Sequence, residues 1–259
     1  MILTEKNRID AFTDQGWWGK DTLYSLFQDS LIACKDQEAL VDPKNRNDIT
    51  GDDPKRLSFK EIDEIVERYA CIFFEHGLRK DDIVIIQLPN VVELPIVYLA
   101  LSKLGIISSP VPMQYGAYEI TSIIAETKPK AYISVKNFNG NAHAEQFQSV
   151  FNNNELMFAL GNINNFIDLN DCYPSRELYE SQNSYAKDNP ITANDIFTIC
   201  WTSGTTGTPK GVPRSHNLWL PMAKAAAFVS ETKEGDTLLN PFPMINMASI
   251  GGFLYNWLL

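Results

Sequence analysis

Cysteine and histidine are scarce in this chain, and neither is spaced for disulfide chemistry or metal binding. Four cysteines and three histidines occur among 259 residues, without a Cys-x-x-Cys pair or the short histidine spacing typical of zinc ligands. Cys71 and Cys200 lie in apolar runs, which favours buried, reduced thiols. The sequence therefore indicates neither a metal centre nor a disulfide framework, and we expect a cytoplasmic protein.

Positive charge is also in short supply. The chain has 22 Lys and Arg against 32 Asp and Glu, a formal net charge of −10. Binding to nucleic acid or to an anionic membrane requires a basic face, so both classes are disfavoured. No apolar run is long enough to cross a bilayer, and the first residues carry Glu5, Asp10 and Asp14 where a signal peptide would be apolar. We expect no nucleic-acid partner and no integral membrane segment.

Two common nucleotide-binding motifs are missing from the chain's glycine-rich loop. A Walker A motif places four residues between its two glycines. Counting from Gly204, the second glycine would fall at Pro209. The Gly-x-Gly-x-x-Gly fingerprint of dinucleotide sites is absent from this loop as well. The sequence thus disfavours a P-loop kinase and a dinucleotide-binding dehydrogenase.

What this loop does contain is glycine, hydroxyl groups and one lysine. Residues 202–211 read Thr-Ser-Gly-Thr-Thr-Gly-Thr-Pro-Lys-Gly. Glycine lets the backbone approach a ligand, successive N–H groups form a concave anion site, and hydroxyls and lysine add donors and charge. We expect a buried strand over 196–201 and a helix after Ser215, a strand–loop–helix layout common in phosphate binding. The pattern predicts a phosphate-binding loop.

This ten-residue run resembles the phosphate loop of the adenylate-forming (AMP-binding) superfamily, which includes acyl-CoA and aryl-CoA synthetases. The similarity extends over nearly the whole chain, in segments that match the family's entry, its first helix and the strands that follow. These segments are Gly16-Trp17-Trp18, Leu57-Ser58-Phe59-Lys60-Glu61-Ile62, Pro89-Asn90 with Glu93-Leu94-Pro95, and Leu104-Gly105-Ile106-Ile107-Ser108-Ser109-Pro110-Val111-Pro112.

The resemblance implies an ATP-dependent carboxylic acid–CoA ligase of fatty acid metabolism. A carboxylate attacks the α-phosphorus of Mg·ATP, and a thiol then displaces AMP from the acyl-adenylate. The implied cofactors are ATP, Mg²⁺ and CoA, or a phosphopantetheinyl carrier protein. Lys210 is expected to stabilise charge during catalysis, and no metal ligand is assignable. The residues expected to bind the ATP phosphates are Thr202, Ser203, Gly204, Thr205, Thr206, Gly207, Thr208 and Lys210.

A second segment, residues 241–252, resembles the part of acyl-CoA synthetases that carries a histidine or an aromatic residue near the acyl carboxylate. The aligned residue here is Asn246, which can orient a carboxylate by hydrogen bonding but cannot titrate. Capping of the following helix is an equal alternative, and one residue could do both. The expected acyl pocket comprises Asn246, Met247, Ile250 and Gly251, with close helix–sheet packing as the other reading of the glycine.

Three bulky residues near these segments could have either a functional or a packing role. Arg214 could meet phosphate or CoA, although a solvated surface charge is the commoner role for an exposed arginine. For Trp219 and Trp257, packing in the core or along a pocket wall is the better prediction.

Short apolar runs alternate with amphipathic segments, which predicts an α/β fold with doubly wound, mostly parallel sheets and flanking helices. The expected strands cover 83–88, 106–111, 131–135 and 156–160, and the expected helices cover 58–77, 91–104 and 118–127. Residues 137–154 are expected to form a mobile surface connection, and the polar stretch 171–194 to link two lobes. We place a first α/β subdomain at 1–180 and the start of a second at 181–259.

The chain stops inside an apolar, helix-like run at Leu259. We therefore expect an N-terminal fragment that lacks the C-terminal small domain and has little activity alone. Two further readings of function stay open: an aryl or acyl acid–AMP ligase that loads a carrier protein in siderophore or nonribosomal peptide synthesis, and a non-catalytic nucleotide-binding module.

Overall fold

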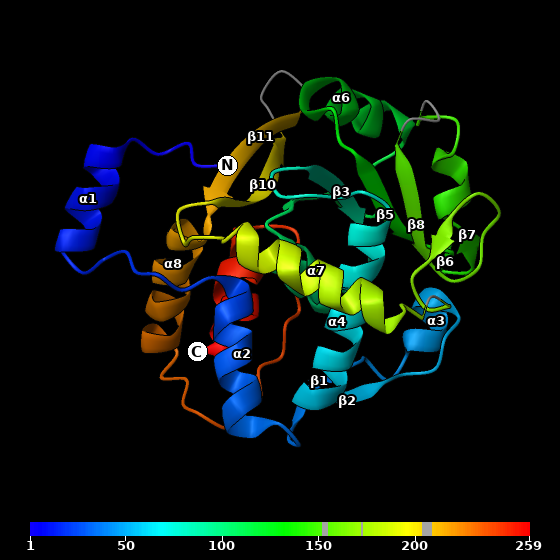
Figure 1. Cartoon of the computed structure of the whole chain (residues 1–259). Helices are drawn as coiled ribbons and strands as arrows, with labels where there is room; N and C mark the ends of the chain where they lie inside the picture. Colours follow the sequence, from blue (N-terminus) through cyan, green and yellow to red (C-terminus); the bar gives the residue numbers. More distant parts are fainter. Residues whose placement is uncertain (152–154, 172, 204–208) are drawn as a thin grey trace.

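A seven-stranded, mostly parallel sheet forms the centre of the chain in the computed structural model (Figure 1). The structure describes residues 1–151, 155–171, 173–203 and 209–259. The strand order is β11-β10-β4-β3-β5-β8-β9, and only β10 and β11 pair antiparallel. The strands are β3 (Ile83–Gln87), β4 (Ile107–Pro110), β5 (Ala131–Val135), β8 (Leu156–Leu160), β9 (Ile167–Asp168), β10 (Ile196–Ser203) and β11 (Pro209–Ser215).

Helices and two small two-stranded sheets surround this sheet. The helices are α1 (Lys6–Asp14), α2 (Leu23–Cys34), α3 (Arg46–Thr50), α4 (Phe59–Glu75), α5 (Glu93–Leu104), α6 (Ala117–Thr127), α7 (Arg176–Asp188), α8 (His216–Val229), α9 (Met247–Ser249), the π-helical η2 (Ile250–Leu254) and α10 (Tyr255–Leu258), with the 3₁₀ turn η1 (Ala144–Phe147). The small sheets pair β1 (Glu38–Val41) with β2 (Arg56–Ser58), and β6 (Asn137–Phe138) with β7 (Asn141–Ala142).

Both faces of the central sheet are covered, as the continuous apolar strands require. Val84 and Ile86 of β3 belong to the larger core, which contains α4 and α5. Ile85 lies between them and belongs to a second cluster with Ile120 and Ile123 of α6. Since adjacent residues of a strand point to opposite faces, helices lie on both sides of the sheet. The predicted doubly wound α/β fold is confirmed.

The predicted elements between residues 58 and 135 form close to their expected bounds. Helix α4 begins with the predicted capping box: Ser58 Oγ accepts from the Glu61 N–H (3.3 Å), and a Glu61 carboxylate oxygen accepts from the Ser58 N–H (2.8 Å). Gly77 follows the helix with φ +84°, a conformation that suits glycine. Helix α5 is buried along its whole length, so it fills the space between the sheet and α4.

The segment after the phosphate loop differs from the prediction. Residues 209–215 form strand β11, which pairs antiparallel with β10, so the loop joins two strands of a hairpin. Proline is tolerated in this strand because β11 lies at the sheet edge. Helix α8 does start after Ser215, but the Ser215 hydroxyl makes no capping bond and has no partner among the described atoms. The division into 1–180 and 181–259 stays a prediction.

Two polar stretches contain more regular structure than expected. Residues 137–147 form the β6–β7 hairpin and η1, where we expected a mobile surface connection. Residues 176–188 form α7, whose Tyr185 packs against Phe74 of α4 with ring centroids 5.3 Å apart. Apolar residues are few in α7, so the sequence pattern did not predict this helix. It packs against its neighbours on one side.

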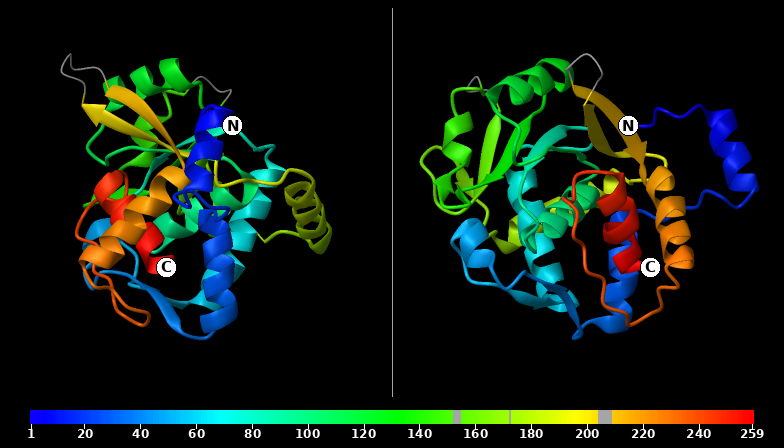
Figure 2. Two further views of the ribbon diagram at one scale, coloured as in Figure 1. Left: turned by 90° about the vertical axis from the view of Figure 1, so that its left-hand side faces the viewer. Right: turned by 180° about the vertical axis from the view of Figure 1, so that it is seen from behind.

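One buried histidine joins three separate helices. His216, at the start of α8, has its Nδ1 2.6 Å from the Tyr255 hydroxyl of α10 and 3.2 Å from the Leu23 N–H of α2. The ring stacks on Phe197 at 4.9 Å. With two donors directed at Nδ1, the ring is neutral, and burial lowers the pKa of His216 to about 3. Figure 2 shows α2, α8 and α10 side by side.

The cysteines and tryptophans behave as packing residues. Cys71 and Cys200 are buried free thiols, as predicted, while Cys172 lies outside the described residues. Trp219 is fully buried, and its Nε1–H donates to Thr198 Oγ1 (3.0 Å). The Trp257 ring stacks on Phe59 with centroids 5.8 Å apart. The packing reading of both tryptophans is therefore confirmed.

Helix α1 projects from the body of the chain (Figure 1, Figure 2) and contains no buried residue. The segment before it is attached to the sheet: the Met1 carbonyl accepts from the Ile196 N–H (2.8 Å), and the Met1 ammonium pairs with Asp195 (2.9 Å). Across the ranges that the structure describes, no helix is long and apolar enough to span a membrane.

Candidate active site

The β10–β11 hairpin places the two ends of the predicted phosphate loop side by side. Thr202 and Lys210 are paired in register, and the Thr202 hydroxyl donates to the Lys210 carbonyl (3.4 Å). Both residues are exposed. The main chain of Ser203 pairs with Pro209, and the predicted phosphate ligands Gly204, Thr205, Thr206, Gly207 and Thr208 lie outside the described residues.

Strand β10 ends at the carboxyl edge of the sheet, at Ser203. β10 runs parallel to β4, and β4 runs parallel to β3, so the ends of all three strands meet at one edge. Ligands of open α/β sheets bind beyond this edge. The exposed Lys210 at this place can contact an anionic ligand.

Gly211 has a packing role beside its place in the motif. A Cβ at this position would lie 2.9 Å from Ile199 Cγ2 and 3.2 Å from the Trp201 ring. Real Cβ atoms do not approach side chains that closely without a shift of the neighbours. The glycine that ends the predicted phosphate loop therefore lets the Trp201 ring lie against the hairpin.

Asn90 ties the β3–α5 turn to the second predicted segment. Its Nδ2 donates to the Phe242 carbonyl (2.7 Å), and its Oδ1 accepts from the Met244 N–H (3.0 Å). The Tyr98 hydroxyl of α5 donates to the Met244 carbonyl (2.6 Å). Three hydrogen bonds thus hold residues 242–244 against elements that lie about 150 positions earlier in the chain. Sequence patterns contain no signal for these bonds beyond the resemblance at Pro89-Asn90.

Asn246 caps the helical turn that follows it. Its Oδ1 accepts from the Ser249 N–H (3.3 Å), and Asn240 Nδ2 donates to Ser249 Oγ (2.7 Å). The capping alternative is thereby confirmed. Asn246 itself is exposed, so its amide nitrogen remains accessible to a ligand. The predicted role in orienting a carboxylate stays a prediction.

The other residues of the predicted acyl pocket divide into two groups. Ile250 is fully buried in the core, whereas Met247 is 41% exposed. Gly251 packs on α8: a Cβ there would lie 3.1 Å from Met222 Cε and 3.4 Å from the Trp219 ring. The glycine therefore permits close packing of η2 on helix α8, where the alternative reading had expected packing on a sheet, and Met247 is the more accessible residue of this group.

Arg214 connects the phosphate hairpin to the second segment. Its Nη2 lies 2.9 Å from Met247 Sδ, and its guanidinium carbon lies 5.3 Å from the centre of the Trp219 ring. The side chain is half-buried rather than fully solvated. The solvated-charge reading of Arg214 is therefore wrong, because the guanidinium packs between α8 and α9.

A buried ion network lies beneath the Asn90 turn. Arg46 pairs with Asp42, with Glu93 (2.9 Å) and with Asp52 (3.5 Å). Asp42 Oδ1 also accepts from the Val92 N–H (2.9 Å). Burial opposes the charge of Glu93, but hydrogen bonds and charge from Arg46 and Lys55 hold the pKa of this carboxyl below its usual value. The network fixes the start of α5, and hence the turn that holds residues 242–244.

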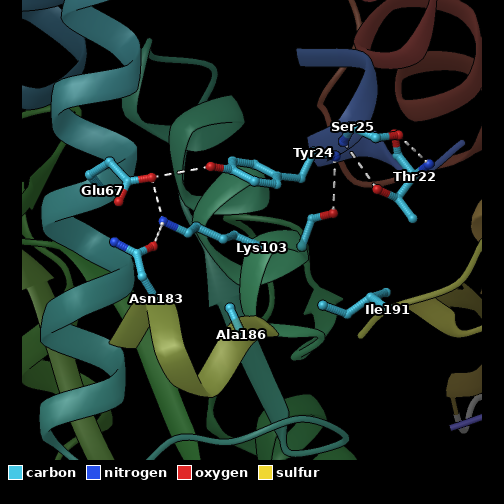
Figure 3. Close-up of a pocket in the computed structure, with 9 residues that line it drawn as sticks. Thr22, Tyr24, Ser25, Glu67, Lys103, Asn183, Ala186 and Ile191 are labelled. Atoms are coloured by element: carbon cyan, nitrogen blue, oxygen red, sulfur yellow. Dashed lines mark hydrogen bonds and ion pairs between the residues drawn. The ribbon is translucent and has the colours of Figure 1, made fainter. Parts of the chain in front are cut away.

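A pocket of about 480 Å³ opens elsewhere, among α2, α4, α5 and α7 (Figure 3). Lys103 in this pocket pairs with Glu67 and donates to Asn183 Oδ1 (2.9 Å), and the Tyr24 hydroxyl donates to Glu67 (3.1 Å). Lys103 precedes β4 by a few residues, so the pocket lies toward the amino ends of the strands. Its charged groups satisfy one another, and it does not contain the predicted phosphate ligands.

Metal ligands are not grouped in the part of the chain that the structure describes. No cluster of three or more histidine, cysteine, aspartate or glutamate side chains there could hold an ion.

Sequence comparison supplies the family. The sequence profile of the family described as AMP-binding enzyme matches residues 27–259. The chain belongs to this family. AMP-binding enzymes of this kind are adenylate-forming ligases, and the match includes the hairpin, the Asn90 turn and the Asn246 segment described above.

Individual relatives of this chain are distant. Long-chain-fatty-acid–CoA ligase FadD13 of Mycobacterium tuberculosis is 25% identical over 223 residues, covering 85% of this chain and 42% of the relative. The 2,3-dihydroxybenzoate-AMP ligase of Bacillus subtilis is 23% identical over 238 residues, covering 91% and 41%. This chain thus spans less than half the length of these relatives.

Solved structures support the fold of this chain. The apo structure of MbtA from Mycobacterium smegmatis superposes with a TM-score of 0.81 over 100% of this chain and 46% of that chain, at 18% identity. A long-chain-fatty-acid-CoA ligase from Archaeoglobus fulgidus gives a TM-score of 0.73 over 93% and 45%, at 20% identity. At these identities the similarity concerns the fold alone.

Proposed function

We propose that the protein activates a carboxylic acid with Mg·ATP, forming an acyl-adenylate and pyrophosphate, and then transfers the acyl group to a thiol. The observation that carries the proposal is the hairpin, which presents Thr202 and Lys210 together at the carboxyl edge of the sheet. Two anions must meet in the first step, so positive charge and donors on the phosphates lower its barrier. Lys210 supplies a mobile charge for this purpose.

The acid is proposed to lie between this hairpin and the Asn246 segment. The contact between Arg214 and Met247 supports this placement, because it joins β11 to the turn that begins at Asn246. We propose that the exposed Asn246 amide orients the carboxylate, while its Oδ1 retains the capping bond. Met247, Ile250 and Gly251 complete the proposed acyl pocket.

The thiol acceptor is proposed to be CoA, with a phosphopantetheinyl carrier protein as the second candidate. The family supports both, because its relatives are named as CoA ligases and as AMP ligases. Measuring thioester formation with CoA and with a carrier protein would separate the two candidates.

The decisive experiment is ATP–pyrophosphate exchange by the product of the complete reading frame, screened against a panel of carboxylic acids. We expect exchange that depends on one class of acid. Binding of ATP without exchange for any acid would contradict the proposal and favour a non-catalytic nucleotide-binding module.

Lys210→Met tests the phosphate site directly. Loss of the charge should slow acid-dependent exchange on the order of 10²-fold, as removal of a preorganised charge-stabilising group does. Lys224, an exposed residue of α8, offers a matched control, and Lys224→Met should exchange at the unmodified rate. Equal rates for both variants would remove Lys210 from the proposed site.

A further inference from the structure

Within the part of the chain that the structure describes, no acidic side chain neutralises the charge of Arg214. Its nearest polar contact is the Met247 thioether at 2.9 Å, and sulfur of this kind is a weak acceptor. No carboxylate pairs with it among the described residues, and its Nε is buried there without a partner. A half-buried guanidinium in this setting retains donor capacity for an oxygen acceptor.

The position of Arg214 along β11 indicates which part of a ligand it can reach. Arg214 and Lys210 are four residues apart on a regularly paired strand, so their side chains leave the same face. Their Cα atoms are about 13 Å apart at the rise of an extended strand. The reacting carboxylate must approach the α-phosphorus near the loop, so Arg214 lies toward the opposite end of the acid.

The surroundings of Arg214 belong to the proposed acyl pocket. Met247 contacts the guanidinium, and Trp219, beneath it, is the residue against which Gly251 packs. A purely alkyl chain placed here would cover the guanidinium without pairing it, which is costly for a charged group. An acid with an oxygen atom at this end would supply the missing acceptor.

We propose that Arg214 is a specificity-determining residue that binds an oxygen acceptor on the acyl part of the acid. The substrate class is a carboxylic acid carrying a hydroxyl, a keto oxygen or a second carboxylate. This inference rests on the proposed function, since it assumes that the acid lies beside β11 and α9.

The test compares matched acids in the product of the complete reading frame and in two variants. The pairs are 4-hydroxybenzoate with benzoate, and hexanedioate with hexanoate, measured by ATP–pyrophosphate exchange and by calorimetric binding. We expect Arg214→Met to lose about tenfold or more in kcat/KM for the oxygenated acid of the preferred pair, the effect of one charge-assisted hydrogen bond. The plain acid should change less than about threefold, and Arg214→Lys should retain part of the preference.

Arg176→Met is the matched control, because Arg176 is 88% exposed and pairs only with the exposed Glu180 among the contacts described. This variant should leave kcat/KM unchanged for both members of each pair. An equal loss for both members of each pair in Arg214→Met would overturn the inference, because Arg214 would then act on a group that all acids share. An unchanged Arg214→Met would overturn it as well.

Failure of the proposed function would give a different experimental result from failure of this inference. If the unmodified protein exchanges pyrophosphate with no acid, the ligase proposal fails, and calorimetry still decides the inference. Tighter binding of the oxygenated acid, lost in Arg214→Met, would support the Arg214 site. Equal binding of the paired acids to both proteins would overturn it.

Discussion

Two arginines of this chain occupy opposite electrostatic situations. Arg46 is 1% exposed, and its guanidinium pairs with three carboxylates. Arg214 is half-buried, and its Nη2 faces a thioether. The Nε of each is buried without a partner, so the contrast lies in the neutralisation of charge. Arg46 is part of the scaffold that positions the Asn90 turn, whereas Arg214 retains the capacity to bind something else.

One of these arginines stabilises the fold, whereas the other remains able to bind a ligand. Burying a charge is tolerable when opposite charges pair with it, and Asp42 and Glu93 pair with Arg46 in this way at the start of α5. A cation left with a weak acceptor gains less from the fold itself. It is therefore the better candidate for contact with a ligand, and the two arginines should respond differently to substitution.

Arg46→Met should give the largest effect. Removal of the guanidinium leaves Asp42 buried without its paired cation and leaves Glu93 with Lys55 as its remaining partner, which should lower the free energy of unfolding by about 3–5 kcal/mol. Urea denaturation measures this loss. Arg56→Met is the matched control, because the Arg56–Glu38 pair is exposed on both sides and should cost less than about 1 kcal/mol. Equal losses in the two variants would remove the distinction on which the comparison depends.

His216 is a third buried ionisable group, and unlike the two arginines it makes its hydrogen bonds in the neutral form. Its pKa is lowered to about 3 in the folded state, against about 6.5 when unfolded. The unfolded chain therefore binds the extra proton first, and stability is lost as the pH falls from about 6.5 toward 3. We expect a loss on the order of 2 kcal/mol between pH 7 and pH 5.

Urea unfolding at both pH values measures this loss. His216→Asn should flatten the pH dependence while lowering stability at pH 7. His143 is also buried, which lowers its pKa to about 4, so His143→Asn should flatten the dependence in part. A pH dependence that is unchanged in His216→Asn would contradict a neutral, buried His216.

Arg214→Met should have the smallest effect on stability. No ion pair is lost, and methionine can cover the Trp219 ring in place of the guanidinium. The free energy of unfolding should change by less than about 1 kcal/mol, within the range of substitutions away from buried networks. A loss as large as that of Arg46→Met would make Arg214 a scaffold residue and would end the contrast between the two arginines.

The local elements were predictable because their signals are local. The capping box at Ser58 and the apolar run of β3 specify their elements within a few residues, and the family resemblance at 202–211 gave the correct family. Strand β11 was missed because its pairing with β10 is decided by contacts across the hairpin, and Pro213 reads as a strand breaker unless the strand lies at an edge.

The site was less predictable, since its contacts join distant parts of the sequence. Asn90 binds main-chain groups at Phe242 and Met244, and His216 meets Tyr255 and Leu23. No periodicity relates such positions. Arg214 could be singled out in the sequence. Its position against Trp219 and Met247 depends on how α9 and η2 pack on α8, and only the folded chain shows this packing.

Strand β11 carries one further consequence for the proposed reaction. An extended strand has a nearly constant rise per residue, so the separation of Lys210 from Arg214 cannot change without breaking the pairing with β10. On the proposed function, this strand sets a fixed distance between the phosphate site at Lys210 and the acyl site at Arg214. It would select acids by the distance from their carboxylate to their second oxygen atom, and a series of dicarboxylates of increasing length should show one optimum.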